Sequence, residues 1–482
     1  MRRAHAVADV RDAEAALMRR LPEGTLMRRA AAGLAATCAG LLGRVYGSRV
    51  VLLVGSGDNG GDALYAGALL ARRGAGVTAA LLAPERAHPG GLDALRAAGG
   101  LAVTDLAAAT RLIDRADVVL DGIVGIGGKG GLRDDAAPLA AAADRSAGLT
   151  VAVDLPSGID PDTGEVPGAA VRADVTVTFG THKPGLLVDP GARYAGAVRL
   201  VPIGIDPGPP VLEALHHSDL AGLLPVPGEL SDKYRRGVVG VVAGSARYPG
   251  AAVLAVAGAL AGAAGAVRYV GPAADAVVRR FPEVLVHAGP PADAGRVQAW
   301  VIGPGIGDGS GAREAIAQVL GSGVPVLVDA DGLALLRDTT VEPSAELLLT
   351  PHAGEAAALL GTDRAAVEAA RLAHVRELAR ARRATVLLKG STTLVADPVP
   401  APVRVNPTGT GWLATAGSGD VLSGLAGSLL AAGLTARDAG SVAAYLHGLA
   451  ARRATGVPGA PITAMDVAAA LPGAWRDAVT PG

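Results

Sequence analysis

The sequence predicts a protein of two α/β domains, and three observations support this fold class. The chain has 482 residues, which is more than one ordinary hydrophobic core holds together. Short apolar strands alternate with helical stretches in both halves, an order that gives parallel sheets covered by helices. Between the halves, Ile205 to Arg236 carries five prolines and only a weak helical pattern, as expected of a domain junction. We therefore expect domains at residues 1–210 and 225–482, joined by a linker at 211–224.

The composition excludes several classes of function. The net charge is −1, so there is no electrostatic basis for binding nucleic acid or an anionic membrane. The single Cys38 permits no internal disulfide and suits a reducing compartment. The first eighteen residues carry charges throughout and lack the apolar centre of a signal peptide. We expect a cytoplasmic protein that binds neither nucleic acid nor membrane.

One uncharged segment is long enough to suggest a membrane span. It runs over eighteen residues from Gly250 to Val267. Alanine and glycine fill most of it, and such residues gain little from lipid but allow a helix to pack closely against a sheet. We interpret the segment as buried in the second domain.

Lysine and asparagine are scarce in this chain. Of 44 basic residues only four are lysines, and there are two asparagines in total. Since arginine replaces lysine wherever a generic charge suffices, the remaining residues are candidates for specific roles. They are Lys129, Lys183, Lys233, Lys389, Asn59 and Asn406.

The first half predicts one ligand site at the carboxyl ends of its strands. Glycine-rich or polar clusters follow four strands, and ligands of parallel sheets bind at this edge. The clusters are Gly55 to Asp62, Asp121 to Arg133, Asp154 to Gly158 and Gly180 to Gly185.

The first of these clusters contains G-x-G-x-x-G at Gly55, Gly57 and Gly60, the pattern of a redox dinucleotide fold. The carboxylates of Asp58 and Asp62 would lie where a pyrophosphate binds, which argues against a dehydrogenase.

Several polar residues in these clusters have candidate chemistry. Asn59, Asp121 and Ser157 offer hard oxygen ligands with little charge, which suits K⁺. Asp154 is placed either for acid–base work or to cap the turn before Pro156. The loop from Gly125 to Arg133 is either a flexible anion-binding loop or a mobile surface loop.

The motifs G-S-G-D-N-G-G-D, D-G-I-V-G-I-G and V-D-L-P-S-G occur in the order and spacing of the NAD(P)HX epimerase domain, where NAD(P)HX is hydrated NADH or NADPH. The first half therefore resembles the N-terminal domain of bifunctional NAD(P)H-hydrate repair enzymes. The resemblance implies a Rossmann-like three-layer α/β/α fold, K⁺ held by Asn59, Asp121 and Ser157, and a catalytic Asp154. Asp58 stands where the family usually has asparagine. The implied substrate contacts are Asp154 and Asp58, Asn59, Gly60, Gly61, Asp62, Gly125, Ile126, Gly127, Gly128, Lys129, Gly130 and Gly131.

The second half contains a long glycine-rich motif from Asn406 to Gly424. It leads to one carboxylate, Asp420, followed by an apolar run that predicts a buried helix. Amides at the helix start, from Gly417 to Asp420, would face an anion. A carboxylate beside a phosphate site must serve another purpose, most simply taking a proton from a hydroxyl. The alternative is a turn in which Asp420 caps the helix.

Two further strand-end clusters fit a nucleotide and its metal. Lys389 and the hydroxyls from Ser391 to Thr393 suit phosphate or ribose. His352 and Glu355 follow another strand, and Glu355 could reach a phosphate-bound Mg²⁺. The alternative for His352 is an ordinary loop residue.

The motifs G-P-G-I-G, T-P-H-A-G-E, L-K-G-S-T-T and G-S-G-D are similar to those of ribokinase-like, ADP- or ATP-dependent NAD(P)H-hydrate dehydratases. This resemblance implies a ribokinase-like α/β domain. It assigns hydrated-cofactor contacts to Ala251, Gly305, His352 and Asp420, with Asp420 catalytic. It assigns nucleotide contacts to Lys389, Gly390, Ser391, Thr392, Thr393, Thr410, Gly411, Trp412, Leu413, Ala414, Thr415, Ala416, Gly417, Ser418 and Gly419.

Together the two resemblances imply an isomerase and lyase that repairs hydrated NADH and NADPH. One domain would interconvert the R and S epimers, and the other would dehydrate the S epimer with ADP and Mg²⁺, giving AMP and phosphate. A homo-oligomer is expected. The alternatives are a ribokinase-like small-molecule kinase, which leaves the first domain unexplained, and a non-catalytic nucleotide sensor.

Overall fold

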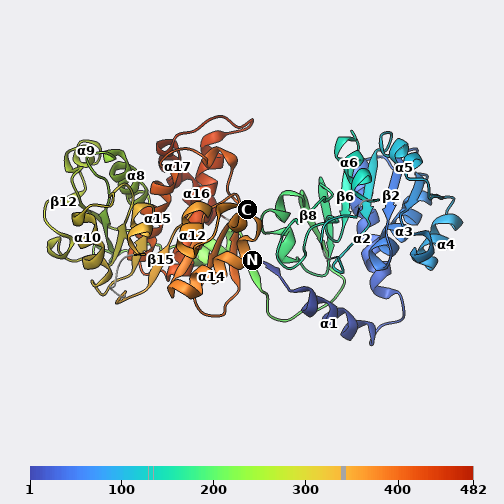
Figure 1. Ribbon diagram of the computed structural model, residues 1–482, viewed down its shortest axis with the longest axis horizontal. Helices are drawn as coiled ribbons and strands as arrows, with labels where there is room; N and C mark the ends of the chain where they lie inside the picture. The colour runs from blue at the N-terminus through green and yellow to red at the C-terminus, as the bar shows by residue number, and fades with distance from the viewer. Residues whose placement is uncertain (129, 134, 338–342, 481–482) are drawn as a thin grey trace. The chain divides into compact units, whose positions relative to one another are not determined.

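The computed structural model describes the chain except residues 129, 134, 338–342 and 481–482 (Figure 1). The chain forms two compact units, one of Arg3–Leu212 and the other of Met1–Arg2 with Glu213–Gly482. Each unit has its own β-sheet and its own helices. The prediction of two α/β domains is confirmed.

The first unit is built on a seven-stranded sheet in which all the described strand pairs are parallel. The order is β4 (Leu101–Val103), β3 (Gly76–Leu81), β2 (Arg49–Val54), β5 (Val118–Gly122), β6 (Leu149–Val153), β7 (Val175–Phe179) and β8 (Ala197–Val201). The parallel sheet expected from the alternating strands and helices is confirmed.

Two hydrophobic cores, one on each face of this sheet, make the unit a three-layer structure. Successive residues of β2 enter different cores, Leu52 one and Leu53 the other, because side chains alternate along a strand. One core contains α2 (Thr25–Leu42), α3 (Asp58–Ala71) and α4 (Pro89–Ala97), and the other contains α5 (Leu106–Ile113) and α6 (Ala137–Arg145). Helix α1 (Val7–Met18) precedes them.

The second unit contains a mixed sheet. Its order is β1 (Arg2–Ala4), β9 (Leu212–Ala214), β18 (Val403–Asn406), β17 (Thr393–Ala396), β16 (Thr385–Leu388), β15 (Leu347–Leu349), β14 (Val326–Val328), β13 (Ala299–Ile302), β10 (Val238–Val242), β11 (Ala266–Val270) and β12 (Leu285–His287). Pairs from β16 to β12 are parallel, whereas β16–β17 and β17–β18 are antiparallel. The few residues between β16 and β17 are too short for the crossover that parallel strands require.

The helices of this unit follow its strands in the expected alternation. They are α7 (His217–Leu223), α8 (Pro249–Leu260), α9 (Ala274–Arg280), α10 (Ser310–Leu320), α11 (Asp331–Leu335), α12 (Ala353–Leu360), α13 (Arg364–Ala369), α14 (Arg371–Arg382), α15 (Ser418–Ala431), α16 (Ala436–Thr455) and α17 (Ala464–Val479).

The uncharged segment from Gly250 to Val267 forms α8 and the start of β11. Helix α8 contacts β10 and β11, as predicted, but its closest packing is against α15. A Cβ built on Gly424 would lie 1.8 Å from the Ala255 carbonyl oxygen, and one on Gly258 would lie 2.0 Å from the Val421 oxygen. Small residues therefore bring the two helix backbones together. None of the helices described is long and apolar enough to cross a membrane.

Candidate active sites

The first unit contains a cavity of about 700 Å³ at the carboxyl ends of its strands. Among the residues proposed from sequence, its lining includes Asp58, Asn59, Asp62, Gly125, Ile126, Gly127, Gly128, Gly130, Gly131 and Asp154. Lys129 lies outside the described residues. Gly60 and Gly61 do not line the cavity. Gly60 instead lets the start of α3 pack against the preceding loop, since a Cβ at this position would lie 2.6 Å from the Gly55 carbonyl oxygen.

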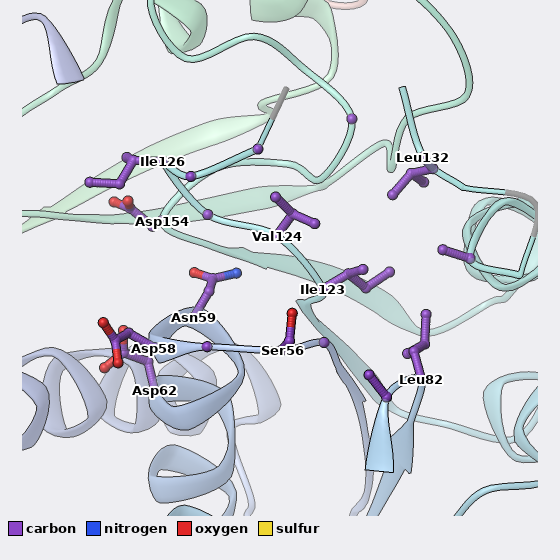
Figure 2. Close-up of a pocket in the computed structure, with 18 of the residues that line it drawn as sticks. Ser56, Asp58, Asn59, Asp62, Leu82, Ile123, Val124, Ile126, Leu132 and Asp154 are labelled. Carbon is purple, nitrogen blue, oxygen red and sulfur yellow. The ribbon is translucent and has the colours of Figure 1, made fainter. Parts of the chain in front are cut away.

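The carboxylates of this lining lie close together. Figure 2 shows Asp58, Asn59, Asp62 and Asp154 gathered on one side of the view, with Ile126 beside Asp154. The apolar side chains of Leu82 and Leu132 lie on the other side. A ligand in the cavity can therefore meet several carboxylates at once.

Asp154 is held by its backbone and by three donors. It follows β6 with φ 66°, a left-handed conformation that is rare outside glycine. Its Oδ1 accepts hydrogen bonds from Thr178 Oγ1 at 3.0 Å, from the Phe179 amide at 3.1 Å, and from the ammonium of Lys183. Both side chains are buried, Lys183 to within 1% of full burial. All the hydrogen bonds described for this carboxylate are to Oδ1, so Oδ2 is the oxygen left for a ligand in the cavity.

Lys183 was not singled out from sequence as a site residue. It belongs to the fourth strand-end cluster, and it connects that cluster to the cavity through Asp154. Besides the carboxylate, its ammonium donates to Thr178 Oγ1 at 3.1 Å and to the Phe179 carbonyl at 3.0 Å. The scarcity of lysine was the signal that could have identified it.

Helix α1 adds a face to this cavity that sequence reasoning also missed. Arg11, Glu14 and Met18 line it from positions three and four residues apart, which share one side of a helix. Burial raises the pKa of Glu14, and burial together with the charges of Asp154, Asp58 and Glu14 raises that of Asp62. The cavity therefore collects carboxyl groups that hold protons more tightly than usual.

Asp121 and Ser157 form a buried pair beside the cavity. Asp121 accepts from the Ser157 amide at 2.7 Å and from Ser157 Oγ at 2.6 Å, and burial raises its pKa to about 6. Near them, the amide of Asn59 has a buried Nδ2 with no hydrogen-bond partner among the described residues. An amide can be turned to present its oxygen instead. A fully buried carboxylate, a hydroxyl and an unsatisfied amide are a donor set that fits a cation.

The second unit contains a cavity of about 540 Å³ at the start of α15. It brings together the predicted residues Ala251, Gly305, Ala416, Gly417 and Asp420. The lining also includes Arg247, Tyr248 and Asp331. The helix begins at Ser418, with Gly417 preceding it at φ 83°, so that Asp420 lies in the first turn.

The surroundings of Asp420 suit a carboxylate that exchanges a proton near neutral pH. Burial first, and then the charge of Asp329, raise its pKa to about 7, while Lys389 acts in the opposite direction. A base is most effective when its pKa lies near the working pH. The helix cap suggested as an alternative is not formed by Asp420, because the N-cap position is Gly417.

Asp329 links Asp420 to Lys389, and sequence reasoning did not assign it to the site. Its Oδ1 accepts from Lys389 Nζ at 2.7 Å, and its Oδ2 accepts from Ser423 Oγ at 2.6 Å. Burial would lower the pKa of Lys389, but Asp329 and Glu355 together raise it. Lys389 is therefore a permanent cation at the end of β16. The strand-end motif D-A-D-G contained Asp329 and was the available signal.

His352 does not line the cavity. It is the N-cap of α12, where its Nδ1 accepts from the Glu355 amide at 3.1 Å and Glu355 Oε2 accepts from the His352 amide at 2.7 Å. The same Oε2 lies 3.7 Å from Lys389 Nζ. His352 therefore caps α12, and the substrate contact expected of it remains a prediction.

The turn after Lys389 is organised by a buried arginine. Arg371 Nη2 donates to the carbonyls of Leu388 at 3.3 Å, Lys389 at 3.0 Å and Thr392 at 3.3 Å. The predicted nucleotide contacts Lys389 to Thr393 thus form the tight connection between β16 and β17. Trp412 lies in a short 3₁₀ turn (Gly411–Leu413) with its side chain 42% exposed.

The fold and the two cavities define a two-domain α/β enzyme with a candidate acid–base carboxylate in each domain, Asp154 in one and Asp420 in the other. Residues 23–185 match the family of YjeF-related protein N-termini, and residues 239–472 match NAD(P)H-hydrate dehydratase. The bifunctional NAD(P)H-hydrate repair enzyme Nnr of Mycobacterium leprae is 49% identical over 467 residues, 95% of each chain. The chain belongs to the family of bifunctional NAD(P)H-hydrate repair enzymes, which confirms the resemblance stated from its motifs.

Solved structures support the same assignment for the second fold. The ADP/ATP-dependent NAD(P)H-hydrate dehydratase of Bacillus subtilis, co-crystallised with ATP and Mg²⁺, is 28% identical, covers 55% of this chain and 97% of its own, and superposes with a TM-score of 0.51. A ribokinase-like superfamily protein of Enterococcus faecalis, 20% identical, covers 56% of this chain and 97% of its own with a TM-score of 0.51, a likeness of fold alone.

Proposed function

We propose that this chain restores hydrated NADH and NADPH in two reactions, one in each unit. The first unit interconverts the R and S epimers of NAD(P)HX. The second dehydrates the S epimer with ADP and releases NAD(P)H, AMP and phosphate. The observation that carries the proposal is the position of Asp420, whose pKa is about 7, in a cavity at the start of α15. The first turn of α15 would then provide both the base, Asp420, and the backbone amides that bind the phosphate.

In the dehydration, Asp420 takes the proton of the hydroxyl on the ring carbon next to nitrogen. The hydroxyl oxygen attacks the terminal phosphorus of ADP, and AMP leaves. The resulting phosphate ester is a far better leaving group than hydroxide. The ring nitrogen donates its electron pair, and the carbon–oxygen bond breaks. The departing phosphate takes a proton from the neighbouring ring carbon, and the electron pair of that carbon–hydrogen bond forms the double bond of the dihydronicotinamide.

Several groups of the second unit support this step. The first turn of α15 lies at the cavity, and Lys389 Nζ lies 3.5 Å from a Cβ built on Gly419 of that turn. The helix amides and this ammonium would stabilise a phosphoryl group bound there. Mg²⁺ would neutralise charge on the phosphates of ADP. Among the residues that the structure describes, no three His, Cys, Asp or Glu side chains are grouped to hold a metal. We propose Glu355 as a side chain that would contact this ion.

In the epimerisation, Asp154 accepts the hydroxyl proton while the bond between the ring carbon and nitrogen opens. The nitrogen keeps the electron pair, delocalised toward the carboxamide. Asp154 returns the proton when the ring closes on the opposite face. The left-handed backbone and the Lys183 contact hold the carboxylate in one place for both transfers.

A K⁺ ion is the cation we propose for Asn59, Asp121 and Ser157. It would provide a fixed positive charge beside the substrate. The unsatisfied Asn59 amide and the raised pKa of the buried Asp121 support this choice. A cytoplasmic location and a homo-oligomer remain predictions.

The proposed function is tested by supplying an equal mixture of epimers with ADP and Mg²⁺ and following the absorbance of the reduced nicotinamide. Full recovery supports both activities. Rapid recovery of half the material, followed by slow conversion, means that the first unit is inactive. Absence of recovery refutes the repair function.

A further inference from the structure

The loop between β18 and α15 lies directly on helix α16. This loop contains the stretch proposed to bind the nucleotide, from Thr410 to Gly419. A Cβ built on Gly448 of α16 would lie 2.1 Å from Thr408 Oγ1 and 2.9 Å from the Gly409 nitrogen. The helix therefore has a glycine where the loop crosses it, and no side chain separates the two backbones.

Both ends of the loop lie against the same helix. At the entrance, Thr408 Oγ1 lies 3.0 Å from the Tyr445 carbonyl and 3.0 Å from Asn406 Oδ1. At the exit, the buried imidazole of His447 lies near the Ser418 backbone. Asn406, which had no assigned role from sequence, thus closes the turn that brings the chain onto α16.

Arg452 makes the largest set of contacts between helix and loop. Its Nε donates to the Thr408 carbonyl at 2.6 Å, and its Nη2 lies 3.0 Å from the Gly409 oxygen and 3.5 Å from the Pro407 oxygen. Three successive carbonyls pointing to one place require a multivalent donor, which the guanidinium supplies. In a planar trans peptide the C=O and the N–H point in opposite directions. Because the Gly409 carbonyl points at Arg452, the N–H of Thr410 points away from it.

We propose that Arg452 is a positioning residue for the nucleotide. It holds the carbonyls of residues 407–409 on α16 and thereby presents the following amides, from Thr410 onward, to ADP. The inference rests on the proposed function, because it assigns this loop to ADP. It adds a residue that touches no substrate but determines how tightly the nucleotide binds.

Substitution of Arg452 gives a clean test because its side chain lies mainly at the surface. Arg452→Ala leaves no buried cavity. Loss of one or two charge-assisted hydrogen bonds should loosen the loop and weaken ADP binding about tenfold. We expect the KM and the calorimetric Kd for ADP to rise together, with kcat less affected. Arg452→Lys should restore only part of the affinity, because one ammonium cannot hold three carbonyls.

The neighbouring Arg453 is the matched control. It occupies the next position of α16 and pairs with Asp477 instead of the loop. Arg453→Ala should leave the Kd for ADP unchanged. The epimerase activity of every variant, measured in the full chain, should equal that of the wild type, since it belongs to the other unit. If Arg452→Ala does not fold, Arg452→Lys carries the same comparison.

Two results overturn the proposal. One is an ADP Kd in Arg452→Ala equal to that of the wild type. The other is an equal loss in Arg452→Ala and Arg453→Ala, which would make the effect a general one of the helix end. Failure of the proposed function is distinguishable, because a wild-type chain that binds ADP but recovers no NAD(P)H refutes the reaction and leaves the binding comparison valid.

Discussion

Replacing Asp420 by asparagine should abolish the dehydratase and at the same time stabilise the second unit at neutral and higher pH. The reason is the cost of ionising a buried carboxyl. Burial and the charge of Asp329 raise its pKa from 3.8 to about 7, so the folded protein disfavours the charged form that the reaction needs. Asparagine keeps the shape and removes the charge.

The size of the effect follows from the two pKa values. Between pH 4 and pH 7 the folded carboxyl is protonated while the unfolded one is ionised, so the free energy of unfolding falls as pH rises. Above pH 7 the contribution of the protonated carboxyl to stability is gone. A difference of about three units corresponds to on the order of 4 kcal/mol. Asp420→Asn should escape this loss. At pH 8 its second unit should melt roughly 10 °C higher than the wild type, and at pH 4 the two should nearly coincide.

Thermal unfolding of the full chain at the two pH values measures this difference. The transition that ADP shifts identifies the second unit. Asp154→Asn is the control, since it changes a carboxyl in the other unit and should leave that transition in place. Equal or lower stability of Asp420→Asn at pH 8 would show that Asp420 is not strained by ionisation, and the reasoning about its pKa would fail.

Three further predictions concern the rate, the first site and the helix packing. Dehydration of the S epimer should be about ten times faster at pH 8 than at pH 6, because the ionised fraction of Asp420 rises from about 9% to about 91%; a flat profile of kcat/KM contradicts its role as base. Lys183→Met should slow epimerisation by about 100-fold and leave dehydration of the S epimer unchanged, because a buried Asp154 without its ammonium is displaced; unchanged epimer exchange would count against the pair. Gly424→Ala should lower the free energy of unfolding of the second unit, measured by chemical denaturation, by about 3 kcal/mol or more, since its Cβ meets the Ala255 carbonyl. Gly311→Ala is the control and should have little effect, because the space around Gly311 is open. Equal stability of the two variants would mean that α8 and α15 can separate at no cost.

The sequence was informative wherever local pattern decides structure. Alternating strands and helices predicted both α/β units, and the run after Asp420 predicted the buried helix α15. Strand-end motifs placed Asp154 and Asp420 at cavities because parallel strands bring their carboxyl ends to one edge.

The contacts that tune these carboxylates could not be predicted in the same way. Lys183 reaches Asp154 across 29 positions, and Lys389 reaches Asp329 across 60. Such pairs depend on the order of strands in the sheet, and the hydrophobic periodicity of the sequence does not reveal that order. Composition gave a partial substitute: two of the scarce lysines are at the two sites, whereas Lys233 lies exposed beside Tyr234. The face of α1 was missed because Arg11 and Glu14 look like ordinary surface charges.

The close contact between α8 and α15 determines which parts of the second site can adapt to a ligand. With backbone against backbone at Gly258 and Gly424, α15 has no side-chain layer that could yield, so it cannot slide or roll when a nucleotide arrives. Asp420 and the first amides of α15 consequently keep a fixed spacing in the free and bound protein. Any adjustment to the size of the substrate must come from the segments that precede and follow α15. The binding free energy of an inhibitor that matches this spacing should not be reduced by deformation of the helix.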